Sequence, residues 1–287
     1  MKKKTLLMMV SILVFIIGVS IIAYPFVSNF WQQHNRELEI MSYHNSVTSK
    51  EEELLAQEWE KAIAYNQKTK WESSDAFSAA DEVLSEEYLS VLNLDGIMGY
   101  IEIPSIGINL PIKHGTSEKT LEKAVGHLAQ SNLPIGGSGN HAILTGHTGL
   151  PSSMLFTDLD KMMLDDVFYL HILDKTFAYE VDDISVIEPD DLEGLYPVDA
   201  EDYVSLITCT PYGINSHRLI VRGTRVELKQ AENKIPSVGV QVTNNNVYPY
   251  ILLALVVLVV MGVIVLLVIC RRKHTKARKE SNDKQKK

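Results

Sequence analysis

Two long apolar segments enclose a polar middle in this chain. Neither residues 5–34 nor residues 247–270 contain a formally charged side chain. Each segment is longer than the roughly 20 helical residues needed to cross a hydrocarbon core. We therefore predict an N-terminal membrane anchor within residues 1–30 and a C-terminal transmembrane helix over residues 247–270.

The N-terminal segment also has a second interpretation. Lys2, Lys3 and Lys4 precede its apolar run, as in a secretory signal peptide that is cleaved after export. The run is longer than the apolar region of a usual signal, and it lacks a plain small-x-small cleavage site. An uncleaved anchor is therefore the favoured interpretation.

Basic residues gather at the two ends of the chain. Of its 27 Lys and Arg and 36 Asp and Glu, the ends hold 12 basic and two acidic residues, including the basic tail at residues 271–287. The positive-inside rule predicts that both termini are cytoplasmic and that the middle is extracellular at the cell membrane. The middle then carries a net charge of −19, which argues against nucleic acid as a partner.

Helical spacing is found only at the start of the middle region. Ser49 and Glu52 fit a capping box, which predicts an amphipathic helix over residues 50–65 within a helical stalk at residues 31–70. Its apolar positions are Leu55, Trp59, Ala62 and Ile63. Residues 68–85 lack a clear period, so we predict an extended segment or a loop there, followed by a short helix at residues 86–92.

From Gly99 onward the hydrophobic period changes to two, which is typical of strands. Segments rich in β-formers lie at residues 100–103, 106–110, 142–145, 167–173, 176–187, 203–208 and 218–228. One helix is expected at residues 118–125. Closing such a sheet removes its exposed edges. We predict a mainly β fold, a closed barrel over residues 97–230, followed by a linker at residues 231–246.

The extracellular region contains a single cysteine, Cys209. The other cysteine, Cys270, lies at the inner end of the second apolar segment, so Cys209 has no intramolecular disulfide partner in a compartment where cysteines usually pair. A buried cysteine that acts as a small hydrophobic residue is the structural interpretation. The residues around Cys209 favour a reactive thiol instead.

Arg218 follows Cys209 by nine residues, a spacing that would allow the two to pair across a hairpin. The strand that ends at Cys209 leads through a turn-rich segment into a strand that begins at Arg218. Antiparallel pairing would place the two residues opposite each other, about 4.8 Å between strands. Arg222 would lie deeper on the same face, and Arg225 would be a surface charge.

A reactive thiol also needs a proton acceptor or a cation nearby. His147 is the best of nine histidines because it ends a predicted strand between two glycines, which leave room for a substrate backbone. His141 is the second choice, and His217 alternates away from Arg218. The remaining histidines lie in tether segments, in mid-strand or at structural positions: His34, His44, His114, His127, His171 and His274.

These motifs together resemble the signature of the sortases. The short matches are Thr145-Gly146-His147, Thr208-Cys209 and Arg218 nine residues later. Longer stretches at residues 97–104, 144–151, 155–160 and 208–218 resemble the class C sortases, which assemble pili in Gram-positive bacteria. The resemblance covers residues 71–226 and extends to the second apolar segment after the barrel.

The resemblance implies an eight-stranded barrel that cleaves an LPxTG-like sorting signal between Thr and Gly. By analogy, Cys209 is the nucleophile that forms a thioacyl intermediate, His147 is the general acid and base, and Arg218 stabilises the oxyanion or holds the signal. The acceptor would be a lysine amine on the next pilin subunit. No cofactor is implied, and the acidic residues 188–191 lack the spacing of a calcium loop, so no metal is expected.

Class C sortases also carry a lid with an Asp-Pro-aromatic motif across the active site. The matching residues here are Asp75, Ala76 and Phe77. Asp75 would pair with Arg218 or contact the sulfur, and Phe77 would stack on the imidazole. Alanine in place of proline makes the segment less rigid, and the alternative is that both are ordinary loop residues.

Three other functions would fit parts of the sequence. A sortase that anchors surface proteins would use a cell-wall precursor amine as acceptor. A papain-like hydrolase would place cysteine before histidine, whereas His147 precedes Cys209 here. A non-catalytic surface receptor would have an inert Cys209.

Overall fold

The computed structural model describes residues 2–69, 84–150, 154–189, 191, 193–234 and 262. The chain forms two units, residues 1–30 with 243–287 and residues 31–242.

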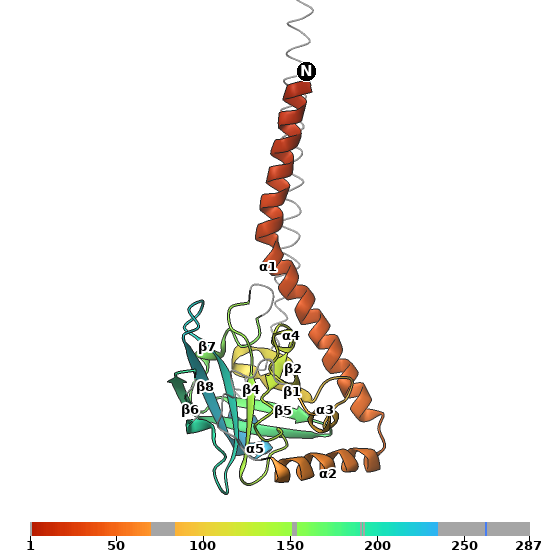
Figure 1. Ribbon diagram of the computed structural model, residues 1–287, viewed down its shortest axis with the longest axis vertical. Coiled ribbons are helices and arrows are strands. Elements are labelled where there is room, and N and C mark those ends of the chain that lie inside the picture. Colours follow the sequence, from red (N-terminus) through yellow and green to blue (C-terminus); the bar gives the residue numbers. More distant parts are fainter. Residues whose placement is uncertain are drawn as a thin grey trace, which may run out of the picture. The chain divides into compact units, whose positions relative to one another are not determined.

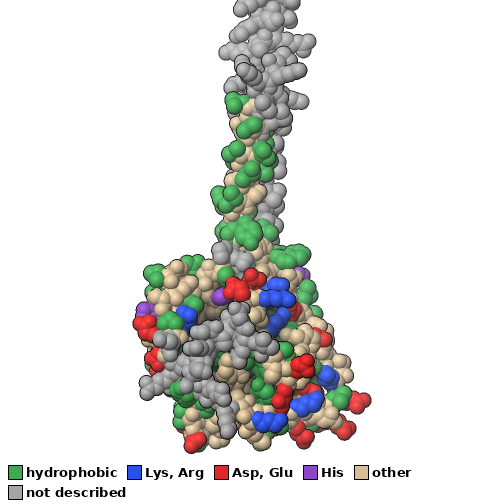
Figure 2. Space-filling model, viewed as in Figure 1, with side chains coloured by type: hydrophobic (Ala, Val, Ile, Leu, Met, Phe, Trp, Pro, Cys, Tyr) green, Lys and Arg blue, Asp and Glu red, His purple; other side chains and the backbone are tan. Residues whose placement is uncertain are grey.

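Helix α1 (Lys2–Thr48) carries the first apolar segment. An 18-residue window in it has a mean hydropathy of 2.5 and is not buried in the protein, and Figure 2 shows hydrophobic side chains gathered along this part of the helix. The helix is therefore compatible with membrane anchoring. Gly262, in the second apolar segment, is also helical, and a Cβ there would lie 3.0 Å from the ring of Phe15. The rest of the predicted second span lies outside the described residues.

The later part of α1 packs on the barrel. Tyr43 is 1% exposed, and its hydroxyl donates to the carbonyl of Met98 at 3.0 Å and accepts from the amide of Leu173 at 2.7 Å. Because a buried hydroxyl without partners would be costly, this pair of hydrogen bonds fixes the helix against two segments of the barrel domain, one at Met98 and one at Leu173.

Helix α2 (Glu52–Lys68) confirms the predicted amphipathic helix. It buries Leu55, Trp59 and Ala62 as expected, whereas Ile63 is 48% exposed. The predicted capping box is wrong: the Ser49 hydroxyl donates back to the carbonyl of Ser46. Because α1 continues to Thr48, the Ser49 hydroxyl serves the end of that helix instead of the start of α2.

Eight strands close into a barrel in the order β1-β2-β3-β4-β7-β8-β6-β5 (Figure 1). The strands are β1 (Gly99–Ile103), β2 (Ile108–His114), β3 (Val125–His127), β4 (Asn140–Thr145), β5 (Val167–Ile172), β6 (Lys175–Ile187), β7 (Asp202–Thr210) and β8 (His217–Val226). The pairs β2–β3 and β4–β7 are parallel and the other pairs are antiparallel. The predicted closed eight-stranded barrel is confirmed.

Short helices complete the fold. The α-helices are α3 (Glu86–Ser90), α4 (Glu118–Leu121) and α5 (Leu228–Lys234), and the 3₁₀ turns are η1 (Pro104–Ile106), η2 (Leu159–Lys161) and η3 (Glu193–Leu195). The helix predicted over residues 118–125 is too long, because β3 begins at Val125. Leu228 starts α5 and does not end a strand.

Alternate residues of the sheet enter two different apolar clusters. Leu144, Leu206 and Val221 belong to the main core inside the barrel. Their neighbours in sequence lie on the opposite face, in a small cluster made of Leu128, Ile143, Leu195, Ile207 and Ile220. This outer cluster therefore includes residues of β4, β7 and β8, and Ile187 packs against it.

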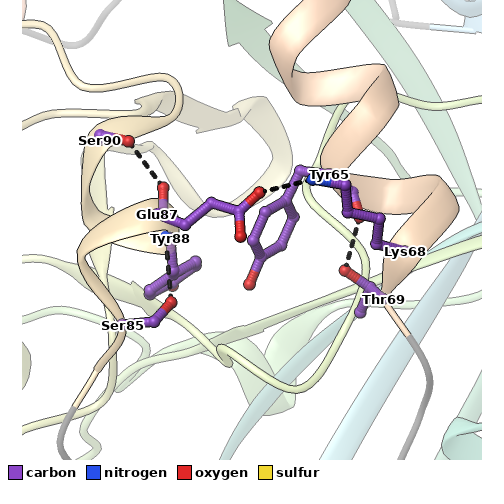
Figure 3. A network of polar contacts seen from close by, with 7 residues as sticks. All are labelled: Tyr65, Lys68, Thr69, Ser85, Glu87, Tyr88 and Ser90. Atoms are coloured by element: carbon purple, nitrogen blue, oxygen red, sulfur yellow. Dashed lines mark hydrogen bonds and ion pairs between the residues drawn. The ribbon is translucent and has the colours of Figure 1, made fainter.

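The described residues on either side of residues 70–83 are held together (Figure 3). Lys68 pairs with Glu87 at 2.9 Å, and the rings of Tyr65 and Tyr88 have centroids 6.0 Å apart. The Ser85 hydroxyl caps α3 by accepting from the amide of Tyr88. The end of α2 and the start of α3 therefore form one packed junction.

Two buried histidines make the stability of the barrel sensitive to acid. His127 and His141 are 0% exposed. His127 contacts the hydroxyl of Tyr88 at 2.8 Å, and His141 contacts that of Ser205 at 2.8 Å. Burial, which disfavours the charged imidazole, lowers the pKa of each to about 4 from the ordinary value of 6.5.

We expect the free energy of unfolding to fall as the pH drops from about 6.5 towards about 4. The unfolded chain takes up protons in this range while the folded histidines stay neutral, so each histidine costs up to roughly 3 kcal/mol at the acid end. Urea unfolding of the detergent-solubilised protein between these pH values measures the slope. His141→Gln should reduce that slope, and an identical slope in both proteins would contradict the assignment.

Candidate active site

The ends of β4 and β7 bring His147 level with Cys209. In the parallel β4–β7 pair, Thr145 lies opposite Ile207. His147 and Cys209 each follow two residues later. The threonine between Ile207 and Cys209 ties the two strands, because the Thr208 hydroxyl donates to the carbonyl of Gly146 at 2.7 Å.

The third residue comes from β8. Arg218 lies directly opposite Cys209 in the antiparallel β7–β8 pair and opposite Ile187 on its other side. The predicted pairing of cysteine and arginine across a hairpin is confirmed. His147, Cys209 and Arg218 therefore stand in one row across three adjacent strand ends.

This row lies on the outer face of the barrel. Cys209 follows Ile207, and Arg218 precedes Ile220, by two residues, so they share the face of the outer cluster. Cys209 is a partly exposed free cysteine, and the side chain of His147 is 24% exposed. Both side chains are therefore partly accessible, on the same face of the barrel as the apolar outer cluster.

The two arginines on this face have different surroundings. The guanidinium of Arg222 makes a two-pronged contact with Asp182, 3.0 Å for each nitrogen, and lies over the ring of Tyr203. Arg218 donates to backbone carbonyls, those of His217 and Asn215. Among the described residues, no acidic side chain forms an ion pair with Arg218.

The loop that carries His147 is closely packed. A Cβ at Gly146 would lie 2.8 Å from the ring of Phe156, and the amide of Phe156 donates to the carbonyl of His147 at 3.0 Å. These contacts fix the backbone of the histidine. Glycine is needed here for close packing, in addition to the substrate access that the sequence suggested.

The second-choice histidine is not part of this row. His141 is buried, with one ring nitrogen against the Ser205 hydroxyl and the other 3.2 Å from the carbonyl of Tyr196. It ties the segment before β7 to the sheet. His217 pairs with Glu188 at 3.2 Å.

Two residues beside the site were missed by the sequence reasoning. Tyr212 and Ile214 in the β7–β8 loop are 70% and 72% exposed, and the Tyr212 ring lies against Gly149 of the histidine loop. The sequence signal that could have revealed them is the presence of large apolar side chains in a segment rich in turn-forming residues. Tyr212 and Ile214 form an apolar rim next to Cys209.

Other predicted features have a simpler outcome. Asp75 and Phe77 lie outside the described residues. Within the described part of the chain, no group of three or more His, Cys, Asp or Glu side chains is arranged to hold a metal ion.

The geometry suits nucleophilic acyl transfer. A thiolate can attack a peptide carbonyl, an imidazole at the same level can move the proton, and a guanidinium can face the oxygen that becomes negative. The three side chains come from parts of the chain about 60 and nine residues apart, so the fold itself assembles the site.

Comparisons with known proteins agree with this geometry. The sortase domain family matches residues 101–226. Sortase A of Bacillus anthracis is 26% identical over 229 residues, which are 80% of this chain and 99% of the relative.

Solved structures give higher identities. Sortase C1 of Streptococcus agalactiae is 46% identical with a TM-score of 0.60, over 66% of this chain and 98% of that one. A pilus-related sortase C of Group B Streptococcus is 35% identical with a TM-score of 0.62, over 66% and 97%. This chain belongs to the sortase family of cysteine transpeptidases.

Proposed function

We propose that the protein polymerises pilin subunits by transpeptidation at Cys209. The observation that carries this proposal is the single row of His147, Cys209 and Arg218 across β4, β7 and β8. The substrate would be an LPxTG-like sorting signal of a pilin, cut between Thr and Gly.

The reaction proceeds in two steps. The Cys209 thiolate attacks the Thr carbonyl, Arg218 faces the resulting oxyanion, and His147 gives a proton to the leaving Gly amine as the C–N bond breaks. In the second step a lysine amine attacks the thioester, His147 accepts its proton, and the thiolate leaves. An isopeptide bond replaces the original peptide bond, and the enzyme is regenerated.

The sortases C among the relatives support a pilin acceptor. The sortases C are 35% to 46% identical to this chain, whereas the sortase A of Bacillus anthracis is 26% identical. The sortase A relatives leave one second candidate, transfer to a cell-wall precursor amine. Covalent pilin multimers distinguish the first candidate from the second.

The proposed topology places the barrel outside the cell, with both termini in the cytoplasm. Lys2, Lys3 and Lys4 precede the first apolar segment, and the basic tail at residues 271–287 follows the second. The positive-inside rule therefore predicts that both ends are cytoplasmic. Anchored near membrane-held pilins, the barrel meets them at a raised effective concentration without any additional contact.

Mass spectrometry tests the proposed chemistry. Purified protein is incubated with an LPxTG peptide, and the expected product is an adduct on Cys209 with the mass of the peptide up to its Thr. Adding a pilin that carries the acceptor lysine should convert the adduct to an isopeptide. An intact peptide with an unmodified thiol would contradict the proposal.

We further propose that the segment at residues 71–96 acts as a lid that restricts access to Cys209. Asp75→Ala or Phe77→Ala should then increase the rate at which a bulky maleimide alkylates the thiol, because each substitution removes a contact that holds the lid. Ser78→Ala in the same segment is the control and should leave the rate unchanged. Equal rates in all four proteins would remove the lid from the mechanism.

A further inference from the structure

One carboxylate lies beside the imidazole of the candidate site. Oε2 of Glu118 is 3.5 Å from Nε2 of His147. That nitrogen is buried and has no hydrogen-bond partner among the described residues. The contact is at ion-pair distance, and catalytic contacts are often this loose before substrate binds.

Local structure holds Glu118 in place. It is the first residue of α4, which Ser117 caps by accepting from the amide of Thr120 at 3.3 Å. The helix packs closely on β3: the side chain of Leu121 lies so near Gly126 that a Cβ at this glycine would come within 2.9 Å of it. The carboxylate thus projects from a packed turn.

The ring of His147 needs such a partner. Its backbone is fixed by Phe156, but these contacts do not set the rotation of the side chain. Where a histidine serves a nucleophile, a third group usually orients the ring and stabilises its protonated form. Among the described residues, Glu118 is the acidic side chain in contact with this imidazole.

We propose that Glu118 is a positioning residue for His147. It orients the imidazole and stabilises the imidazolium that forms beside the Cys209 thiolate. The inference rests on the proposed role of His147. The side chain of Glu118 is 75% exposed, and exposed ion pairs are weak and screened by salt, so the expected effect is moderate.

Glu118→Gln tests the charge while keeping the shape. We expect kcat for an LPxTG peptide to fall about fivefold with KM unchanged, a loss typical of an exposed ion pair. The difference in kcat between wild type and Glu118→Gln should become smaller as NaCl rises from about 50 mM to about 1 M, because salt screens the ion pair. At low salt, iodoacetamide should also alkylate Cys209 more slowly in Glu118→Gln than in wild type.

Two control variants separate charge from structure. Glu122→Gln removes an exposed carboxylate just past the end of α4 and should match wild type. Ser117→Ala removes the cap and loosens α4, so any effect it has should not depend on salt.

The outcomes are distinct. A Glu118→Gln protein with wild-type kcat, or with a loss that salt does not change, overturns the positioning role. If His147→Ala is as active as wild type, the proposed base fails instead, whatever Glu118→Gln does.

Discussion

We expect Cys209→Ala to abolish both cleavage of an LPxTG peptide and the formation of covalent pilin multimers, while the barrel stays folded. Without the sulfur there is no nucleophile to form the thioester, so the loss is complete and not partial. Cys209 is partly exposed at the end of β7, where a small substitution changes stability by less than about 1 kcal/mol. Gel analysis of pilin multimers and a urea unfolding curve measure the two effects.

Cys270→Ala is the matched control for this variant. Cys270 lies in the second apolar segment, away from the predicted extracellular region, and its replacement should leave multimer formation intact. Pilin multimers made by Cys209→Ala would disprove the nucleophile assignment.

We expect Arg218→Gln to lower kcat by roughly 10²–10³, the usual cost of losing one donor to an oxyanion. The guanidinium interacts with the negative oxygen of the transition state more strongly than with the neutral carbonyl, so kcat falls more than KM rises. Arg218→Lys retains the charge but loses the planar pair of donors. Its kcat should therefore lie between those of the wild type and Arg218→Gln. Steady-state kinetics on the peptide measure both.

Arg222→Gln is the control for charge on the same face. This arginine is engaged with Asp182 and Tyr203, so its loss should lower the free energy of unfolding and leave kcat near wild type. An Arg218→Gln enzyme that keeps more than about a tenth of the wild-type kcat would contradict the oxyanion role, since such a donor is worth more.

Local patterns were enough to predict most of the barrel. Alternation of apolar residues located β7 and β8, and the hairpin between them was sufficient to place Arg218 opposite Cys209. Strand β3 was not predicted, because its three residues, Val125–His127, are too few to show an alternating pattern. The capping box failed because helix signals at Ser49 compete with the end of the preceding helix.

The remaining parts of the site depend on long-range pairing. The parallel β4–β7 pairing that brings His147 level with Cys209 joins strands separated by β5 and β6, and alternation does not reveal which strands are neighbours. The assignment of His147 came from its glycines and from the family resemblance. Glu118 was missed because its approach to His147 depends on how α4 packs on β3.

The position of β8 in the chain has a consequence for synthesis. It is the last strand of the barrel and pairs with both β6 and β7, so Arg218 joins the other two residues only when the barrel closes. In a partly folded chain whose β8 is unpaired, the guanidinium of Arg218 is not yet held beside the Cys209 sulfur and the His147 imidazole. On the proposed mechanism, a chain whose β8 has not yet docked therefore lacks the contribution of Arg218 to the rate.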